Sequence, residues 1–175
     1  EYGFYTKVFD FFALDQIGYN DERQYLYSFV GNGNACPKVR KKVLSLSRKD
    51  ALLVDTQVAF GDTSGRYAHS IAKSFFVLAP RGLGPASFRM FEAMRAGRVP
   101  VIISDEWRPI SGIHWDDFAI RVPQSDIDSI PDILESKKID AIEMGVEARR
   151  VYNNFFSVNS AVGWLIKTGM RLLAN

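Results

Sequence analysis

The sequence predicts an α/β domain in which a parallel sheet lies between two layers of helices. The first observation is that short apolar runs alternate along the chain with amphipathic segments, as strands alternate with helices in such domains. The second is that glycine-rich loops follow two of these runs, at residues 31–34 and 81–84. With 175 residues, the chain is long enough for one domain of this class with a well-buried core.

Composition and charge exclude several classes of protein. The chain is 47% hydrophobic and 24% charged, as is usual for globular proteins, and its net charge of +2 is too small to indicate a nucleic-acid partner. The single cysteine, Cys36, excludes an intramolecular disulfide and a cysteine-rich metal site. No apolar run has the length of a membrane span and no signal-peptide pattern occurs, so membrane association stays an open question.

The centre of the chain is predicted to form a strand, a helix and a second strand. Residues 75–79 and 99–103 are compact apolar runs that indicate buried strands. Between them, Ser87 occupies a helix N-cap position and Gly97 a helix stop, which predicts a helix between these two residues. The loop before Ser87 therefore lies where α/β folds bind anions and nucleotides. The residues of this helix expected in the core are Phe88, Phe91 and Met94.

Two further strands are predicted before this central unit. Residues 23–31 form the first of them and end in a loop with two glycines, and residues 51–55 form the second. Pro37 suits the first turn of a helix that runs to Leu46, with apolar residues inward and basic residues outward. These basic residues fit either a second anion site or an ordinary solvated face, and the sequence leaves both alternatives open.

The rest of the chain is predicted to complete one domain. A short strand is expected over residues 118–122, followed by a helix and by two amphipathic helices over residues 138–155 and 157–174. Residues 1–22 are rich in aromatic side chains without a clean period, which indicates a connecting or docking segment. The domain itself is therefore expected to span residues 23–175.

Polar residues around the central loop form a candidate anion and nucleotide site. The Arg81 guanidinium can form paired hydrogen bonds with a phosphate, and Ser87 and the N–H groups at the helix start add uncharged donors. Arg89 and Glu92 are three residues apart on one helix face, and a carboxylate there can accept hydrogen bonds from both hydroxyls of a ribose. The alternative is a surface ion pair between Arg89 and Glu92, which the spacing favours equally.

These segments resemble the exostosin family of glycosyltransferases. The likeness is carried by Ser74–Gly82, Ser87–Gly97 and Val99–Asp105, and it extends over residues 23–155. Further segments that fit the family pattern are Arg23 to Gly31, Arg40, Trp107–Ile110 and His114–Phe118. The resemblance implies an enzyme of the GT-B class, built from two Rossmann-like domains with the active site between them. This chain would be the C-terminal half, which is Rossmann-like and binds the donor.

The resemblance also implies the chemistry. Family members are inverting, metal-independent enzymes that transfer a sugar from a nucleotide-diphosphate sugar, here expected to be a UDP-sugar, to a saccharide hydroxyl. No metal or other cofactor is expected, because arginine charge would replace the divalent ion beside the leaving diphosphate. Arg40, Arg81 and Arg89 would neutralise the diphosphate, and Glu92 would hold the ribose. The residues expected to bind the nucleotide sugar are Gly31, Arg40, Arg81, Gly82, Ser87, Arg89, Glu92 and Asp105.

The catalytic base stays unknown from the sequence. His69 and His114 are candidates, but a lone histidine is more often structural or solvated. Asp105 follows the carboxyl end of a predicted strand and is a candidate for contacts with the donor sugar. The sequence departs from the family pattern at Pro85 and at Arg98, where the family often has a small or sulfur-containing residue.

The chain is expected to be part of a longer protein. It begins without methionine, and the resemblance implies an N-terminal Rossmann-like domain that would supply acceptor contacts and the base. The chain alone would then be a catalytically incomplete half. The main alternative is a non-catalytic nucleotide- or sugar-binding module, and nucleic-acid binding through residues 38–42 lacks the interleaved aromatic residues that it needs. The expected location is the cytoplasm for a bacterial or viral protein and the Golgi lumen for a fragment of a eukaryotic one.

Overall fold

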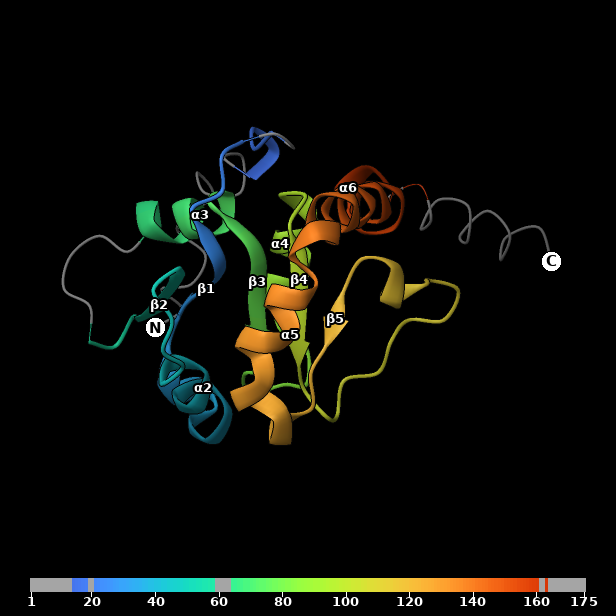
Figure 1. Cartoon of the computed structure of the whole chain (residues 1–175). Coiled ribbons are helices and arrows are strands. Elements are labelled where there is room, and N and C mark those ends of the chain that lie inside the picture. The colour runs from blue at the N-terminus through green and yellow to red at the C-terminus, as the bar shows by residue number, and fades with distance from the viewer. Residues whose placement is uncertain (1–13, 19–20, 59–63, 161–162, 164–175) are drawn as a thin grey trace.

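A five-stranded, wholly parallel sheet forms the centre of the domain, with strand order β2-β1-β3-β4-β5 (Figure 1). The computed structural model describes residues 14–18, 21–58, 64–160 and 163. The strands are β1 (Tyr25–Gly31), β2 (Ala51–Asp55), β3 (Ser74–Pro80), β4 (Val99–Ile103) and β5 (Ile120–Arg121). Helices cover both faces of the sheet, so the predicted three-layer α/β class is confirmed.

The α-helices connect strands of this sheet or follow its last strand. They are α2 (Pro37–Leu44), α3 (Ser64–Ala72), α4 (Phe88–Arg95), α5 (Ile130–Ser136) and α6 (Ala141–Val151). A π-helical turn, η5 (Tyr152–Phe156), follows α6, and most of the helix predicted over residues 157–174 lies outside the described residues. Within the part that the structure describes, no helix is both long and apolar enough to cross a membrane.

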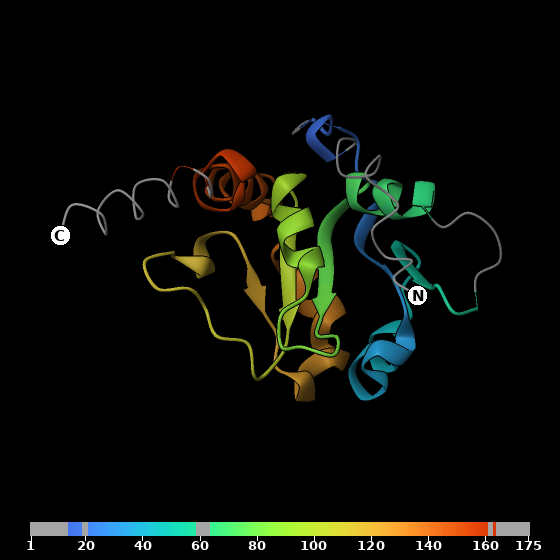
Figure 2. The same cartoon turned by 180° about the vertical axis from the view of Figure 1, so that it is seen from behind.

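Alternate strand residues face opposite helix layers, as the period of two in a strand requires. Phe76 and Leu78 of β3 pack into the core beneath α2 and α5, which lie in front of the sheet in Figure 1. Val77 and Ala79 point the other way, towards α3 and α4, which Figure 2 shows from behind. A shift of one residue in this register would exchange the two faces, so the buried alternation fixes the register.

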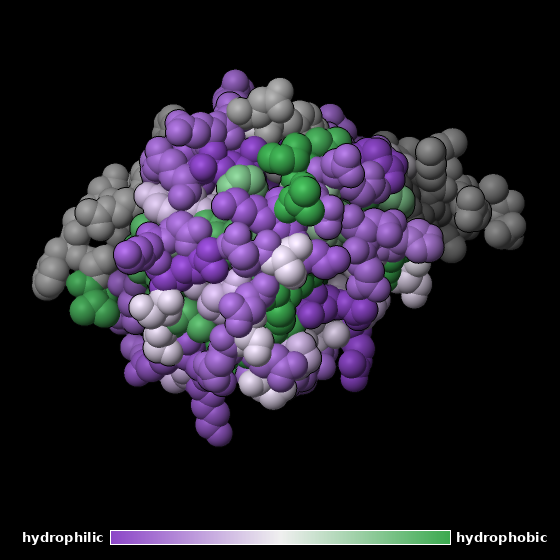
Figure 3. Space-filling model, in the orientation of Figure 1, coloured by the Kyte–Doolittle hydropathy of each residue, from purple (hydrophilic) through white to green (hydrophobic). Residues whose placement is uncertain are grey.

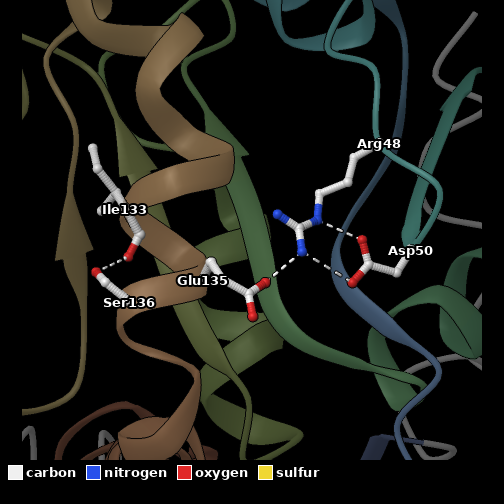
Figure 4. Close-up of polar contacts among 5 residues, drawn as sticks. All are labelled: Arg48, Asp50, Ile133, Glu135 and Ser136. Carbon is white, nitrogen blue, oxygen red and sulfur yellow. Dashed lines mark hydrogen bonds and ion pairs between the residues drawn. The ribbon is translucent and has the colours of Figure 1, made fainter.

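The surface of the α2 and α5 layer is mainly hydrophilic, with hydrophobic side chains in small groups (Figure 3). On this layer, Arg48 donates to both carboxylate oxygens of Asp50, at 2.5 and 3.3 Å, and pairs with Glu135 of α5 (Figure 4). Exposed ion pairs of this kind contribute little to stability. The Arg48 contacts therefore serve mainly to align α5 with the loop before β2.

Residues 14–18 dock at the amino edge of the sheet, by which we mean the side where the parallel strands begin. Arginine side chains bind the backbone of these residues there. Arg98 is 0% exposed, and it donates to the carbonyl oxygens of Gly18 at 3.4 Å and of Ala72 at 2.8 Å. Arg149 donates to the carbonyl oxygen of Ile17 at 2.7 Å. Burial lowers the pKa of Arg98 to about 9, so its charge persists at neutral pH. Arg98, which departs from the family pattern, thus has a structural role in holding the backbone of residues 14–18 against the sheet. The domain boundary at residue 22 stays a prediction.

Candidate functional site

β1 and β3 are neighbours in the middle of the sheet, and the strands that follow them in the chain lie on opposite sides of this pair. From β1 the chain moves to β2 on one side, and from β3 it moves to β4 and β5 on the other. Open α/β sheets bind ligands outside the carboxyl ends of such a strand pair. We call the ends of β1 and β3, with the loops 31–34 and 80–87 that follow them, the β1–β3 edge. The predicted residues of these loops thus come together at one place.

Arg40 of α2 joins the two loops of the β1–β3 edge. Its Nε donates to the carbonyl oxygen of Arg81 at 2.9 Å, and its Nη1 donates to that of Asn32 at 3.1 Å. Burial, and after it the charge of Arg89, lower the pKa of Arg40 to about 10. The side chain therefore keeps its positive charge at neutral pH although it is partly removed from water.

Arg89, in the first turn of α4, reaches back to the end of β1. Its Nη2 donates to the carbonyl oxygen of Val30 at 2.6 Å. Its guanidinium lies 4.6 Å from the ring centroid of Phe29 and 5.3 Å from that of Tyr67, both within cation–π range. Among the described residues, its buried Nε has no hydrogen-bond acceptor and no carboxylate forms an ion pair with Arg89 or Arg40. The β1–β3 edge therefore holds positive charge that no carboxylate balances by direct pairing.

Two glycines make room for these guanidinium groups. A Cβ atom at Gly31 would lie 2.8 Å from Nη2 of Arg89, and one at Gly82 would lie 3.0 Å from Nη2 of Arg40. Both distances are shorter than ordinary van der Waals contact, so any larger residue would displace the guanidinium group beside it. The sequence marks both positions as loop glycines, and the structure adds their contact with the arginines.

The loop between β3 and α4 contributes a third guanidinium group. Nη1 of Arg81 forms an ion pair with Glu106, which follows β4, and the Arg81 side chain is 17% exposed. Its buried Nε lacks an acceptor within the part of the chain that the structure describes. Ser87 stands at the N-cap of α4 with extended backbone, as predicted, but its side chain makes no capping hydrogen bond. The first N–H groups of α4 are thus left without a side-chain cap.

Glu92 lies one turn beyond Arg89 and accepts a hydrogen bond from the hydroxyl of Tyr67 on α3. Burial of Tyr67, together with the nearby Glu92 carboxylate, raises the pKa of this phenol, so the hydroxyl remains a donor at physiological pH. The Tyr67 ring also lies against Arg89, so one partly buried side chain contacts both predicted ligand-binding residues of α4. The sequence did not single out Tyr67, because only the packing of α3 beside α4 brings it here.

Asp105 and the two histidines lie away from this cluster. Asp105 follows β4, and its Oδ1 accepts a hydrogen bond from the backbone N–H of Gln124 at 2.9 Å. His69 is exposed near the amino end of β1, where its ring lies 6.5 Å from that of Tyr25. His114 is exposed in the loop before Trp115. Among the described residues, no group of three or more His, Cys, Asp and Glu side chains is placed to hold a metal ion.

The family model of the Exostosin GT47 domain matches residues 4–137, which is more than half of the chain. The chain belongs to the exostosin family. An exostosin-1 homolog of Caenorhabditis elegans is 42% identical to it over 92 residues, which are 51% of this chain and 24% of that protein. A probable glucuronoxylan glucuronosyltransferase of Arabidopsis thaliana is 42% identical over 71 residues, or 39% of this chain and 16% of that protein.

A probable glucuronosyltransferase of Oryza sativa subsp. japonica is a third relative of this exostosin-family chain. It is 37% identical over 73 residues, which are 41% of the chain and 17% of the relative. The chain thus matches less than a quarter of the length of each of these three proteins. The predicted membership of the exostosin family is confirmed.

Proposed function

We propose that the β1–β3 edge binds the diphosphate of a nucleotide-diphosphate sugar, with UDP as the expected nucleotide. The observation that carries this proposal is the pair of partly buried guanidinium groups of Arg40 and Arg89, with which no carboxylate forms an ion pair among the described residues. Arg81 on the adjoining loop adds a third guanidinium group. Guanidinium groups suit phosphate because their planar donors form paired hydrogen bonds with its oxygens.

The proposed reaction is a single displacement at the anomeric carbon, which inverts its configuration. The acceptor hydroxyl oxygen forms the new bond to this carbon, while the bond from the carbon to the diphosphate oxygen breaks. The hydroxyl proton passes to a base that we expect in the N-terminal domain of the longer protein. Arg40, Arg81 and Arg89 would stabilise the charge that develops on the leaving diphosphate, without a metal ion.

For the nucleoside, we propose that Glu92 binds the ribose hydroxyls. Among the described residues, its carboxylate accepts one hydrogen bond, from the Tyr67 hydroxyl, and it can accept further ones. Tyr67 would then position the carboxylate rather than touch the nucleotide. The names of the Arabidopsis and rice relatives favour UDP-glucuronic acid as the first donor to test and a xylo-oligosaccharide as the first acceptor.

Calorimetric titration of UDP into the Arg89→Ala variant tests the diphosphate site. We expect the variant to bind UDP more weakly by about 1.5–3 kcal/mol, the range for a hydrogen bond to a charged group. Arg150→Ala is the matched control, because Arg150 lies on α6 and pairs only with Glu147 among the residues described. Equal UDP affinity in the Arg89 variant and wild type would remove Arg89 from the site.

Two further measurements separate the parts of the proposal. Glu92→Gln should weaken uridine as well as UDP if Glu92 holds the ribose, whereas an effect on UDP alone would contradict that role. Turnover is measured in the full-length protein as release of UDP from UDP-glucuronic acid in the presence of acceptor. Tight donor binding without any turnover would favour the alternative, a non-catalytic nucleotide-binding module.

A further inference from the structure

A pocket of about 440 Å³ lies at the carboxyl ends of β4 and β5, beside the β1–β3 edge. Its volume falls within the usual range for small-molecule sites. The polar and aromatic residues that line it are Ser104, Asp105, Trp107, Arg108, Asp116 and Arg121. Of these, only Asp105 is among the predicted nucleotide-sugar-binding residues, so the pocket as a whole has no assigned ligand.

Trp107 gives the pocket an aromatic surface that the core holds in place. Its ring packs edge-on against Trp115, with centroids 4.9 Å apart and ring planes at 83°. Trp115 is 4% exposed, and its Nε1 donates to the carbonyl oxygen of Ile110 at 3.3 Å. The same buried residue thus contacts the loop at Trp107 and at Ile110. A ring fixed in this way offers an apolar face to the C–H groups of a sugar ring.

The polar groups of the pocket include both donors and acceptors. Arg108 has no hydrogen-bond or ion-pair partner among the described residues, so its guanidinium donors are available. Asp105 has one oxygen engaged by Gln124, and Asp116 pairs with Arg121 at 3.0 Å. A sugar presents hydroxyls that donate and accept, and it needs such a mixture. The two carboxylates of the lining are matched by two guanidinium groups, so the pocket lacks the excess positive charge of a phosphate site and favours a saccharide.

The distance between the pocket and the β1–β3 edge suits a sugar that reacts beside a diphosphate bound at that edge. Arg81 pairs with Glu106, which stands between the pocket residues Asp105 and Trp107. The middle of the β4–β5 pair is two strand spacings from the middle of the β1–β3 pair, or roughly 10 Å. A diphosphate and the sugar attached to it can span this separation.

We infer that this pocket holds the pyranose ring of a sugar that takes part in the transfer, with its face on Trp107 and its hydroxyls on Asp105 and Arg108. The inference rests on the proposed function, because it uses the β1–β3 edge as the place of the diphosphate. The ring belongs either to the donor or to the end of the acceptor, and both sources present the same chemistry.

Calorimetry with three ligands tests the inference: UDP, UDP-glucuronic acid and a xylo-oligosaccharide. The variants are Trp107→Ala, Arg108→Ala and the control Ile110→Ala, since Ile110 is 51% exposed on the same loop and does not line the pocket. We expect Trp107→Ala to lower the affinity for one sugar-bearing ligand roughly tenfold and to leave UDP affinity unchanged. A loss confined to UDP-glucuronic acid assigns the ring to the donor, and a loss confined to the oligosaccharide assigns it to the acceptor.

Other outcomes overturn the inference, and they differ from those that overturn the proposed function. If UDP binds normally and neither pocket variant changes the affinity for any sugar-bearing ligand, the inference fails alone. A loss of UDP affinity in Trp107→Ala would give the pocket to the nucleobase and also overturn it. A wild-type chain that binds none of the three ligands contradicts both proposals. Near-ultraviolet circular dichroism checks the loop, and Arg108→Ala replaces Trp107→Ala as the test if the latter misfolds.

Discussion

Two clusters of arginines lie at opposite edges of the sheet, and they differ in how completely the protein uses their donors. The amino-edge cluster consists of Arg95, Arg98 and Arg149, and the β1–β3 edge holds Arg40, Arg81 and Arg89. All three nitrogens of the fully buried Arg98 donate to backbone carbonyl oxygens. Arg81 and Arg89 each keep a buried Nε without an acceptor among the described residues. Burial of an arginine therefore does not by itself mark a binding site, whereas unused buried donors favour one.

Helix polarity adds a second difference between the two edges. Arg98 donates to Ala72, the last residue of α3, and to Ala96 and Gly97, which follow α4. Carbonyl groups at helix C-termini lack helical partners and attract cations. Their partial negative charge therefore compensates the positive charge of Arg98. Arg40 and Arg89 instead lie in the first turns of α2 and α4, where the helix end is already positive. The anion of the proposed function would balance the positive charge of the β1–β3 edge.

The largest effect, a loss of folding stability, is expected from a substitution at the amino edge. Arg98→Met keeps most of the side-chain volume but leaves the partly buried carbonyl oxygens of Ala72 and Gly18 without this donor. We expect the free energy of unfolding, measured by urea denaturation, to fall by about 3 kcal/mol or more. Arg150→Met on the surface of α6 is the control and should change little. A small loss in Arg98→Met would show that the two clusters do not differ as described.

The next largest effect should be on binding at the β1–β3 edge. In Gly31→Ala, the new methyl group would meet Nη2 of Arg89 at 2.8 Å and displace it. We expect UDP affinity to fall by about 1–2 kcal/mol, the scale of a local overpacking defect. Gly84→Ala is the matched control, because a Cβ atom there meets nothing within 4 Å. Equal UDP affinities in the two variants would contradict the role given to Gly31.

A smaller effect is expected from Tyr67→Phe. This change removes only the hydroxyl that donates to Glu92 and leaves the ring beneath Arg89. The affinity for uridine should fall by about 1 kcal/mol, the net value of one hydrogen bond. Tyr25→Phe is a suitable control, since the Tyr25 hydroxyl has no hydrogen bond among the residues described. If uridine binds both variants equally well, Tyr67 does not position Glu92.

The smallest expected effect is on the pH dependence of folding stability, and it arises from an ion pair at the amino edge. A hydrogen bond from Arg95 lowers the pKa of Asp15 below 3.8 in the folded protein. The ionised pair therefore stabilises the fold above pH 3.8, and this contribution is lost as the pH falls through the folded value. Asp15→Asn should lose less stability than wild type when urea denaturation is repeated at pH 7 and then at about pH 3. Parallel losses in the two proteins would argue against this contribution.

Most of the fold could be predicted because its signals are local. The apolar runs at 51–55 and 99–103 match β2 and β4 residue for residue, and the helix stop at Gly97 has the positive φ of 65° that glycine tolerates. Where a prediction depended on tertiary contacts, it was less accurate. Phe88 was expected in the core but is 74% exposed, because α4 buries the face that carries Met90, Ala93 and Met94. β5 is shorter than predicted, because only two of its residues pair with β4.

In the candidate site, too, local patterns group some residues, and tertiary contacts alone bring the others together. Arg81, Gly82 and Arg89 are close in sequence, so a strand–loop–helix pattern was enough to group them. Tyr67 lies 25 residues before Glu92, and no local pattern predicts that α3 packs beside α4. Asp105 was grouped with these residues because it follows a strand, yet strand order places β4 beyond β3, away from β1. The binding roles of the predicted site residues stay predictions.

The contacts of Arg40 have a consequence for the rate at which a ligand binds. Its donors reach the carbonyl oxygens of Asn32, Pro80 and Arg81, so protein contacts alone hold the loops after β1 and β3 at one spacing. A ligand that meets loops already ordered loses little conformational entropy, and its association is limited by diffusion rather than by loop closure. Lysine in place of Arg40 would keep the charge but could not span three acceptors. Stopped-flow traces of Arg40→Lys should then acquire a slow, concentration-independent phase.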